Sequence, residues 1–287
     1  MGLLDGKVAI ITGAGGGLGR TYALLLAREG AAIVANDFGG ARDGTGAATT
    51  PAAERIAAEI RANGGRAVAN TSDVSTVQGG REILDSALQA FGQVDILINN
   101  AGILRDKTLV KLEESDWDAV ISVHLRGTYC VTRPVFTWMK EHGRGGVIVN
   151  TASTQGLFGG FGQTNYGAAK AGIFGFSNSL ALEGRKAGIR VWTLCPMAST
   201  RLTMDVLPEE LQKNAAPDKV APVVLYMVSD LSGDQTGKVI YAGGNRVQEF
   251  KIVSAAGFVH DGNVDARTIA ANADRVFMGP TPPIEFF

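Results

Sequence analysis

Three polar side chains in the middle of the chain have the types and spacing needed to move a proton. Tyr166 and Lys170 stand four residues apart in a segment of helical composition, so both should project from one helical face. A phenol has an unperturbed pKa of about 10, and a lysine ammonium beside it favours the phenolate. Ser153 follows a predicted strand and could hydrogen-bond the same substrate oxygen. The three residues therefore predict acid–base chemistry.

Alone, a Tyr-x-x-x-Lys pair means little, because composition produces one in about one chain in four. This pair gains weight from Ser153, which lies thirteen residues before Tyr166. It gains more from a glycine-rich turn near the N-terminus, since chance would not place these signals together.

The glycine-rich turn follows residues 7–12, whose β-branched composition is typical of a buried parallel strand. Gly13, Gly17 and Gly19 form the pattern Gly-x-x-x-Gly-x-Gly, and a helix is expected from about residue 18 to residue 29. The N-terminus of such a helix can face a pyrophosphate. A strand before the turn and a helix after it are what dinucleotide binding requires.

Asp37 follows the end of the second predicted strand, residues 31–36, and lies eighteen residues after Gly19. A carboxylate at this place accepts hydrogen bonds from both ribose hydroxyls of NAD and repels the 2′-phosphate of NADP. The sequence therefore predicts NAD as the cofactor. Two alternatives stay open: Asp37 only starts the following loop, or Arg42 accepts a 2′-phosphate.

Two further segments at strand ends suit a flat, polar cofactor. Asp73 and Val74 follow the third predicted strand and could cradle the adenine, although Asp73 is equally a cap for the next helix. Asn100, Ala101 and Gly102 follow the fourth predicted strand and suit a backbone turn beneath the cofactor. A plain turn would look similar.

Strands alternate with helices along the chain, which predicts a doubly wound, Rossmann-like α/β fold with a parallel sheet of about seven strands. Ligands of such sheets bind at the carboxyl ends of the strands, where all these motifs fall. The expected strands are residues 7–12, 31–36, 67–71, 94–98, 146–152, 189–194 and 238–241. The expected helices include residues 18–29, 52–62, 113–141, 164–186 and 207–231, with one more ending at residue 91.

Composition argues against several classes of partner. The 287 residues carry a net charge of -1 with intermixed signs, so neither nucleic acid nor a membrane surface is an expected partner. Apolar runs are too short to span a membrane, and Cys130 and Cys195 lack metal-ligand or redox spacing. No signal peptide or peroxisomal tripeptide is recognisable, so we expect a cytoplasmic protein. We expect one domain, residues 1–244, and an extension, residues 245–287, that packs on it or on a neighbouring subunit.

Taken together, these motifs resemble the short-chain dehydrogenase/reductase family over residues 3–244. The resemblance rests on the glycine turn, the run Asn99-Asn100-Ala101-Gly102, Ser153 and the Tyr166-x-x-x-Lys170 pair. It implies that Tyr166 is the acid/base, that Ser153 orients the substrate oxygen, and that Lys170 lowers the tyrosine pKa and holds the nicotinamide ribose. It also implies a homodimer or homotetramer formed through residues 113–141 and 164–186.

One position departs from the family pattern. The family usually has an asparagine in the central helix that helps a proton relay from the lysine, whereas this chain has His124. A histidine can donate and accept a proton, so His124 could serve the relay. It could equally be a buried structural histidine, and both interpretations stay open.

A narrower resemblance is to the D-specific 3-hydroxyacyl-CoA dehydrogenase domain of peroxisomal multifunctional enzymes, a group whose members also oxidise 17β-hydroxysteroids. It is carried by residues 36–40, 99–107, 116–127 and 161–166. Without the hydratase and sterol-carrier modules of the eukaryotic enzymes, the chain looks like a free-standing bacterial relative. Arg105, Lys107 and Lys111 are candidate contacts for CoA phosphates, with ordinary solvated charges as the alternative.

The resemblance implies NAD-dependent oxidation of a small-molecule secondary alcohol, foremost a (3R)-hydroxyacyl-CoA. The alternatives are a 17β-hydroxysteroid and a cofactor-binding protein without catalysis, which the intact catalytic residues disfavour. The expected catalytic residues are Ser153, Tyr166, Lys170 and His124, and no metal site is expected. The expected cofactor-binding residues are Gly13, Gly17, Leu18, Gly19, Asp37, Asp73, Val74, Asn100, Ala101, Gly102, Tyr166, Lys170 and Ser199.

Overall fold

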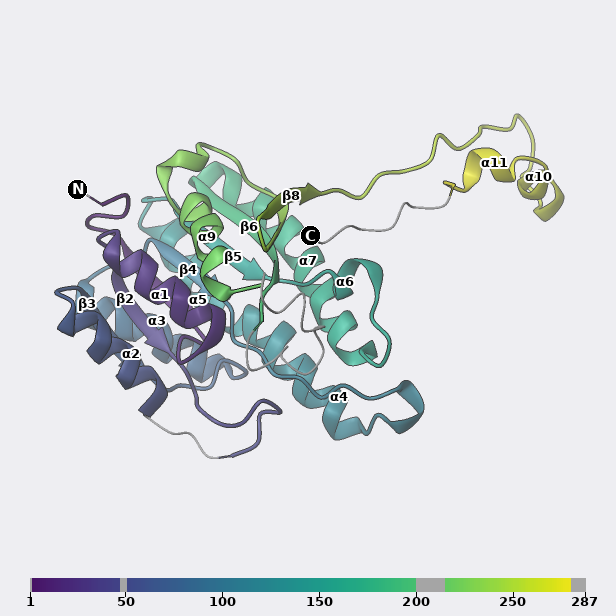
Figure 1. Ribbon diagram of the computed structural model, residues 1–287. Coiled ribbons are helices and arrows are strands. Elements are labelled where there is room, and N and C mark those ends of the chain that lie inside the picture. The colour runs from purple at the N-terminus through teal and green to yellow at the C-terminus, as the bar shows by residue number, and fades with distance from the viewer. Residues whose placement is uncertain (1, 47–50, 200–214, 280–287) are drawn as a thin grey trace.

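The computed structural model describes residues 2–46, 51–199 and 215–279, and it is built around one sheet flanked by helices (Figure 1). The sheet has eight strands in the order β3-β2-β1-β4-β5-β6-β7-β8. Neighbouring strands pair in parallel as far as β7, and β7 pairs with β8 in antiparallel fashion. The strands are β1 Val8–Thr12, β2 Ala32–Asn36, β3 Arg66–Asn70, β4 Ile96–Asn99, β5 Gly146–Thr151, β6 Ile189–Met197, β7 Lys238–Gly243 and β8 Arg246–Phe250.

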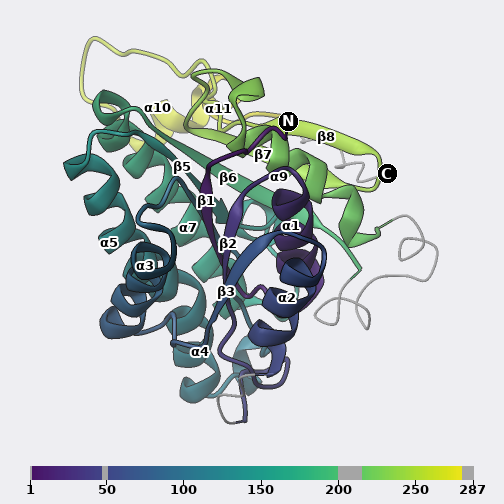
Figure 2. The ribbon, with the colours of Figure 1, turned by 90° about the vertical axis from the view of Figure 1, so that its left-hand side faces the viewer.

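Helices cover both faces of the sheet, as the doubly wound prediction requires (Figure 2). On one face lie α1, α2 and α9, and on the other lie α3, α5 and α7. The helix bounds are α1 Gly17–Arg28, α2 Pro51–Ala62, α3 Val77–Phe91, α4 Glu114–Ile121, α5 Gly127–Glu141, α6 Gln155–Phe158, α7 Thr164–Gly184, α9 Ala221–Val228, α10 Ala266–Ala271 and α11 Ala273–Val276.

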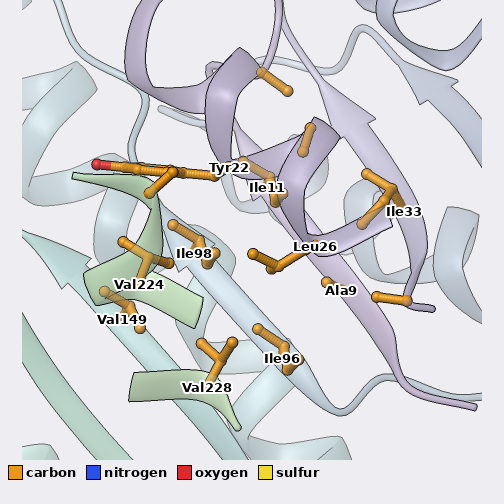
Figure 3. Packing of buried hydrophobic residues seen from close by; sticks show 14 of the residues in the cluster. Ala9, Ile11, Tyr22, Leu26, Ile33, Ile96, Ile98, Val149, Val224 and Val228 are labelled. Carbon is orange, nitrogen blue, oxygen red and sulfur yellow. The ribbon is translucent and has the colours of Figure 1, made fainter. Parts of the chain in front are cut away.

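Two separate hydrophobic clusters fill the two layers between the sheet and its helices. In one of them, Tyr22 and Leu26 of α1 meet Ile98 of β4 and Val224 of α9, all fully buried (Figure 3). The central strands have consecutive buried residues and no alternation, because both of their faces are covered. This packing fixes the strand ends from which the candidate site is built.

The strand register brings the predicted cofactor motifs to one edge of the sheet. Thr12 pairs with Asn36, which in turn pairs with Asn70. The turns that follow β1, β2 and β3 therefore emerge side by side. The strand order reverses between β1 and β4, which is where such folds leave a crevice.

The sheet has eight strands where about seven are expected, because residues 246–250 of the expected C-terminal extension form β8. The two residues between β7 and β8, Gly244 and Asn245, form a hairpin loop in which Gly244 has φ +57°. Glycine at the first loop position is a recognised hairpin signal in a sequence. Beyond β8, the chain leads away from the sheet to α10 and α11 (Figure 1). Packing of this segment on a neighbouring subunit stays a prediction.

The long helices also differ from their predicted forms. Residues 113–141 form α4 and α5, joined by a π-helical segment, Ser122–Arg126, which contains His124. Of the predicted helix 207–231, residues 207–214 lie outside the described residues. The rest forms α9 between two short 3-10 turns, Pro217–Lys219 and Asp230–Ser232. None of the described helices is long and apolar enough to cross a membrane.

Candidate active site

A cavity of about 650 Å³ lies at the carboxyl ends of β1, β2 and β4. Its shape is set by the glycine turn on one side and by residues 100–103 on the other. Most of the predicted cofactor residues line it: Gly13, Gly17, Leu18, Asp37, Asp73, Val74, Asn100, Ala101 and Gly102. Gly19 is buried behind the turn, where a Cβ would clash with the carbonyl oxygen of Gly13.

The glycine turn is held against the end of β4 by backbone contacts that tolerate no side chain. Gly13 has φ +66°, and a Cβ there would lie 2.9 Å from Cα of Ala101. Asn100 Nδ2 donates to the carbonyl oxygens of Thr12 at 3.1 Å and Gly13 at 3.3 Å. This amide therefore braces the glycine turn against the end of β4.

The open side of the turn fits a pyrophosphate. Gly16 precedes α1 and has no side chain that could occupy the first N–H groups of the helix, which remain free to bind an anion. A Cβ at Gly15 would lie 2.6 Å from Oδ2 of Asp37, so only glycine allows this close approach. The residues present thus fit a dinucleotide.

Asp37 is fixed at the wall of the cavity by two backbone N–H groups. Oδ2 accepts from Gly15 at 2.8 Å and Oδ1 accepts from Gly39 at 2.9 Å. The carboxylate is therefore held beside the glycine turn, where a ribose bound to that turn would meet it. Arg42 lines the same cavity, as the alternative for a 2′-phosphate requires.

Sequence reasoning missed Arg55, a second cation in the cavity wall. This α2 residue lines the cavity and its Nη2 donates to the carbonyl oxygen of Gly15 at 3.3 Å. Its position on a helix whose sequence reads as an ordinary amphipathic segment gave no signal. Asp73 is not the cap of α3: Thr76 is, since its side chain accepts from Gly79, whereas Asp73 Oδ1 accepts from Ser75 at 2.8 Å.

The predicted catalytic residues meet where β5 ends and α7 begins. The hydroxyl of Ser153, just beyond β5, lies near the phenol of Tyr166 and acts to lower its pKa. Lys170 Nζ lies 5.5 Å from the centre of the Tyr166 ring and donates to the carbonyl oxygen of Thr151 at 2.6 Å. A second contact joins Ser153 to Gln155, near the start of α6. The helical spacing therefore places phenol and amine together as predicted.

Burial controls the ionisation of both groups. It raises the pKa of Tyr166 to about 12, against a smaller lowering effect of the Ser153 hydrogen bond. It also lowers the pKa of Lys170 to about 7. Burial thus opposes both the phenolate and the ammonium. In the protein by itself, burial outweighs the lowering of the tyrosine pKa that the family resemblance implies.

His124 is buried beside Tyr166, whose ring it meets edge-on at 5.3 Å between centroids. Its Nε2 lies 3.1 Å from the amide nitrogen of Ile103 and 2.8 Å from the carbonyl oxygen of Ile103. Burial, and then the positive charge of Lys170, lower the pKa of His124 to about 3. The neutral ring therefore braces the segment after Gly102, while Nδ1 finds no partner among the described residues. A part in proton relay stays a prediction.

The remaining candidates lie outside this cluster. Ser199 follows β6, and its backbone N–H donates to the carbonyl oxygen of Ala215, away from the cavity lining. Arg105 and Lys107 both pair with Asp116, whereas Lys111 is exposed. Across residues 2–46, 51–199 and 215–279, no group of His, Cys, Asp and Glu side chains could hold a metal ion.

The chain belongs to the short-chain dehydrogenase/reductase family: the family model described as "short chain dehydrogenase" matches residues 7–211. A short-chain type dehydrogenase/reductase of Mycobacterium tuberculosis is 49% identical over 265 residues, 92% of this chain and 92% of that relative. Peroxisomal multifunctional enzyme type 2 of Mus musculus is 45% identical over 233 residues, 81% of this chain and 31% of that enzyme. The crystal structure of a short chain dehydrogenase from Mycobacterium avium matches with a TM-score of 0.84 at 36% identity, over 96% of each chain.

These findings confirm the predicted family and the Rossmann-like fold class. The protein is accordingly an oxidoreductase, related to enzymes that bind a nicotinamide dinucleotide. The cavity and the Ser153, Tyr166 and Lys170 cluster are where this chain would place that cofactor and its substrate.

Replacing Lys170 by methionine removes a buried amine whose protonation the fold opposes. Because burial lowers its pKa from 10.5 to about 7, the unfolded chain binds more protons between these values, and wild-type stability rises with pH across this window. We expect Lys170→Met to raise the free energy of unfolding near neutrality. Its advantage over the wild type should shrink by about 2 kcal/mol between about pH 7 and about pH 9.

Urea unfolding of both proteins at the two pH values measures this difference. The same substitution at the exposed Lys186 is the control and should show no such dependence. An advantage of Lys170→Met that is equal at both pH values would contradict the assigned burial effect.

Proposed function

We propose that the protein oxidises the hydroxyl group of a (3R)-hydroxyacyl-CoA, with NAD as the hydride acceptor. The observation that carries the reaction type is the contact of Ser153 with Tyr166 beside Lys170. Tyr166 packs against the cluster that contains Ile103, and Ile103 lines the cavity that fits a dinucleotide. The likeness to a peroxisomal multifunctional enzyme, and the resemblance to the dehydrogenase domain of that group, support the acyl-CoA substrate.

Each polar residue of the cluster has a defined task in this reaction. Ser153 holds the substrate oxygen, and Tyr166 takes the hydroxyl proton as the carbinol hydride leaves. When bound, the oxidised cofactor would supply the hydride acceptor and, through its positively charged ring, a charge that would offset the cost of a buried phenolate. Lys170, whose amine donates to the carbonyl oxygen of Thr151, would donate to the nicotinamide ribose, as the family resemblance implies. Exclusion of water strengthens all of these interactions.

The preference for NAD is assigned to Asp37. Asp37→Ala should weaken the binding of NAD and reduce the preference for NAD over NADP, because the carboxylate that would repel a 2′-phosphate is gone. Arg42→Ala is the matched variant, since it removes the guanidinium that would otherwise bind that phosphate. The ratio of kcat/KM for the two cofactors measures both effects. An unchanged ratio in Asp37→Ala, together with lost NADP turnover in Arg42→Ala, would assign discrimination to Arg42.

The substrate alternatives differ in the groups they present to the site. A 17β-hydroxysteroid would use the same Ser153 and Tyr166 and would rest on apolar side chains. Phe158, half exposed on α6, offers such a surface and packs edge-on against Phe250 of β8 at 5.4 Å. A cofactor-binding protein without catalysis remains disfavoured, because the catalytic cluster is assembled.

Subunit association is also proposed. The groove between α5 and α7 has a volume of about 700 Å³ and is bordered by Tyr129, Phe136, Phe176 and Leu180. Apolar side chains on two adjacent long helices suit the homodimer or homotetramer expected from the family resemblance. The cytoplasmic location stays a prediction.

The proposed function is tested by following NADH formation with purified protein, NAD and matched (3R)- and (3S)-hydroxyacyl-CoA, with a 17β-hydroxysteroid in parallel. We expect turnover of the (3R) thioester and a much lower kcat/KM for its (3S) isomer, because Ser153 and Tyr166 fix the direction from which the oxygen is held. A higher kcat/KM for the steroid would assign the pocket to sterols, and absence of turnover with all three would contradict the proposal.

A further inference from the structure

Asn165, the residue before Tyr166, is completely buried at the start of α7. Its Oδ1 accepts from the backbone N–H of Tyr166 at 2.8 Å. Its Nδ2 donates to the carbonyl oxygen of Arg105 at 3.0 Å and, at a longer 3.4 Å, to that of Asp116. One amide group thus joins the backbone of Tyr166 to a segment about 50 residues earlier in the chain.

That earlier segment, residues 103–116, is held together by Asp116. The carboxylate of Asp116 accepts from Lys107 Nζ at 2.6 Å and lies 3.7 Å from Nη1 of Arg105. The Lys107 hydrogen bond holds the pKa of Asp116 below its usual range. Lys107 and Arg105 therefore stabilise the fold of this segment. Both are paired with Asp116, so they are not free charges for binding CoA phosphates.

The same segment touches the wall of the cofactor cavity. Arg105 Nε donates to the carbonyl oxygen of Asp43 at 2.7 Å. The backbone N–H of Leu104 donates to the carbonyl oxygen of Arg42 at 3.1 Å, and Arg42 lines the cavity. Residues 103–116 are thus bound on one side to the cavity wall and on the other to Asn165.

We propose that Asn165 is a positioning residue that sets the Tyr166 phenol relative to the cofactor cavity through residues 103–116. This inference rests on the proposed function, because it presumes that Tyr166 transfers a proton. Its decisive element is the donor arm of the amide, because Nδ2 donates to the carbonyl oxygens of both Arg105 and Asp116. The acceptor arm alone would only serve the first turn of α7.

The two arms can be separated by substitution. Asn165→Asp keeps an acceptor for the Tyr166 N–H and favours a helix N-terminus, but its carboxylate repels the carbonyl oxygens of Arg105 and Asp116. Asn165→Ala removes both arms without adding a charge. Asn63→Asp is the control, because it breaks an Nδ2–carbonyl bond, to Glu59, at an exposed site just after α2.

Steady-state kinetics with the preferred alcohol and NADH binding by fluorescence supply the first readout. We expect kcat to fall by about 10- to 100-fold in both Asn165 variants, with the Kd for NADH within about twofold of the wild type, as a misplaced acid/base should give. Asn63→Asp should match the wild type. A role confined to stability would lower the unfolding midpoint and leave kcat of the folded enzyme unchanged.

Amide hydrogen exchange supplies a readout that needs no substrate. Residues 103–116 should exchange faster in Asn165→Asp and Asn165→Ala, whereas α1 and α3 should not change. Asp116→Asn leaves the sequence of α7 unchanged and should produce the same faster exchange in residues 103–116. Wild-type kcat and wild-type protection in Asn165→Asp would overturn the proposal. If the wild type turns over no hydroxyacyl-CoA, the proposed function fails, and exchange alone still decides whether Asn165 holds the segment.

Discussion

The reversal of strand order between β1 and β4 is the constraint on which the site depends. Strands β1 to β3 run outward on one side and β4 to β7 on the other, so the turns after β1 and β4 open side by side. Asn100 then closes the contact by binding the carbonyl oxygens of Thr12 and Gly13. Without this neighbour relation, the glycine turn would be an ordinary loop and the catalytic cluster would have no cofactor beside it.

The second determinant is the burial of the Lys170 amine beside the partly buried phenol of Tyr166. Burial raises the pKa of Tyr166 and lowers that of Lys170, so neither group is charged at low cost in the protein by itself. At a site that disfavours both charges, a bound ligand with a positive charge would lower the cost of forming the phenolate. Burying these two ionisable groups thus costs stability, as is common at functional sites. The packed layers on both faces of the sheet stabilise the fold.

Much of this architecture could be predicted from the sequence. The β1 turn, Asp37, Ser153 and the Tyr166–Lys170 pair were recognisable because each depends on a residue type at a short, fixed spacing. The family and the sheet follow from them. The antiparallel β8 was missed because its only signal is the Gly244–Asn245 hairpin loop, which lay inside a segment assigned to an extension.

Other features had no residue-type signature at all. His124 binds the backbone of Ile103, Asn165 binds the backbone of Arg105 and Asp116, and Arg55 reaches the carbonyl oxygen of Gly15. Backbone carbonyls look alike in every sequence, so contacts to them appear only when the chain is folded. The same holds for the π-helical segment around His124, where local composition reads as ordinary helix.

The proposed reaction depends on transfer of the substrate alcohol's proton to Tyr166. The most direct measurement is NADH formation in a single turnover by wild type and Tyr166→Phe, each saturated with NAD. We expect Tyr166→Phe to bind NAD as the wild type does and to form NADH about 10²- to 10⁴-fold more slowly, the usual contribution of a general acid or base. An unchanged rate in Tyr166→Phe would show that the phenol takes no part in the proton transfer.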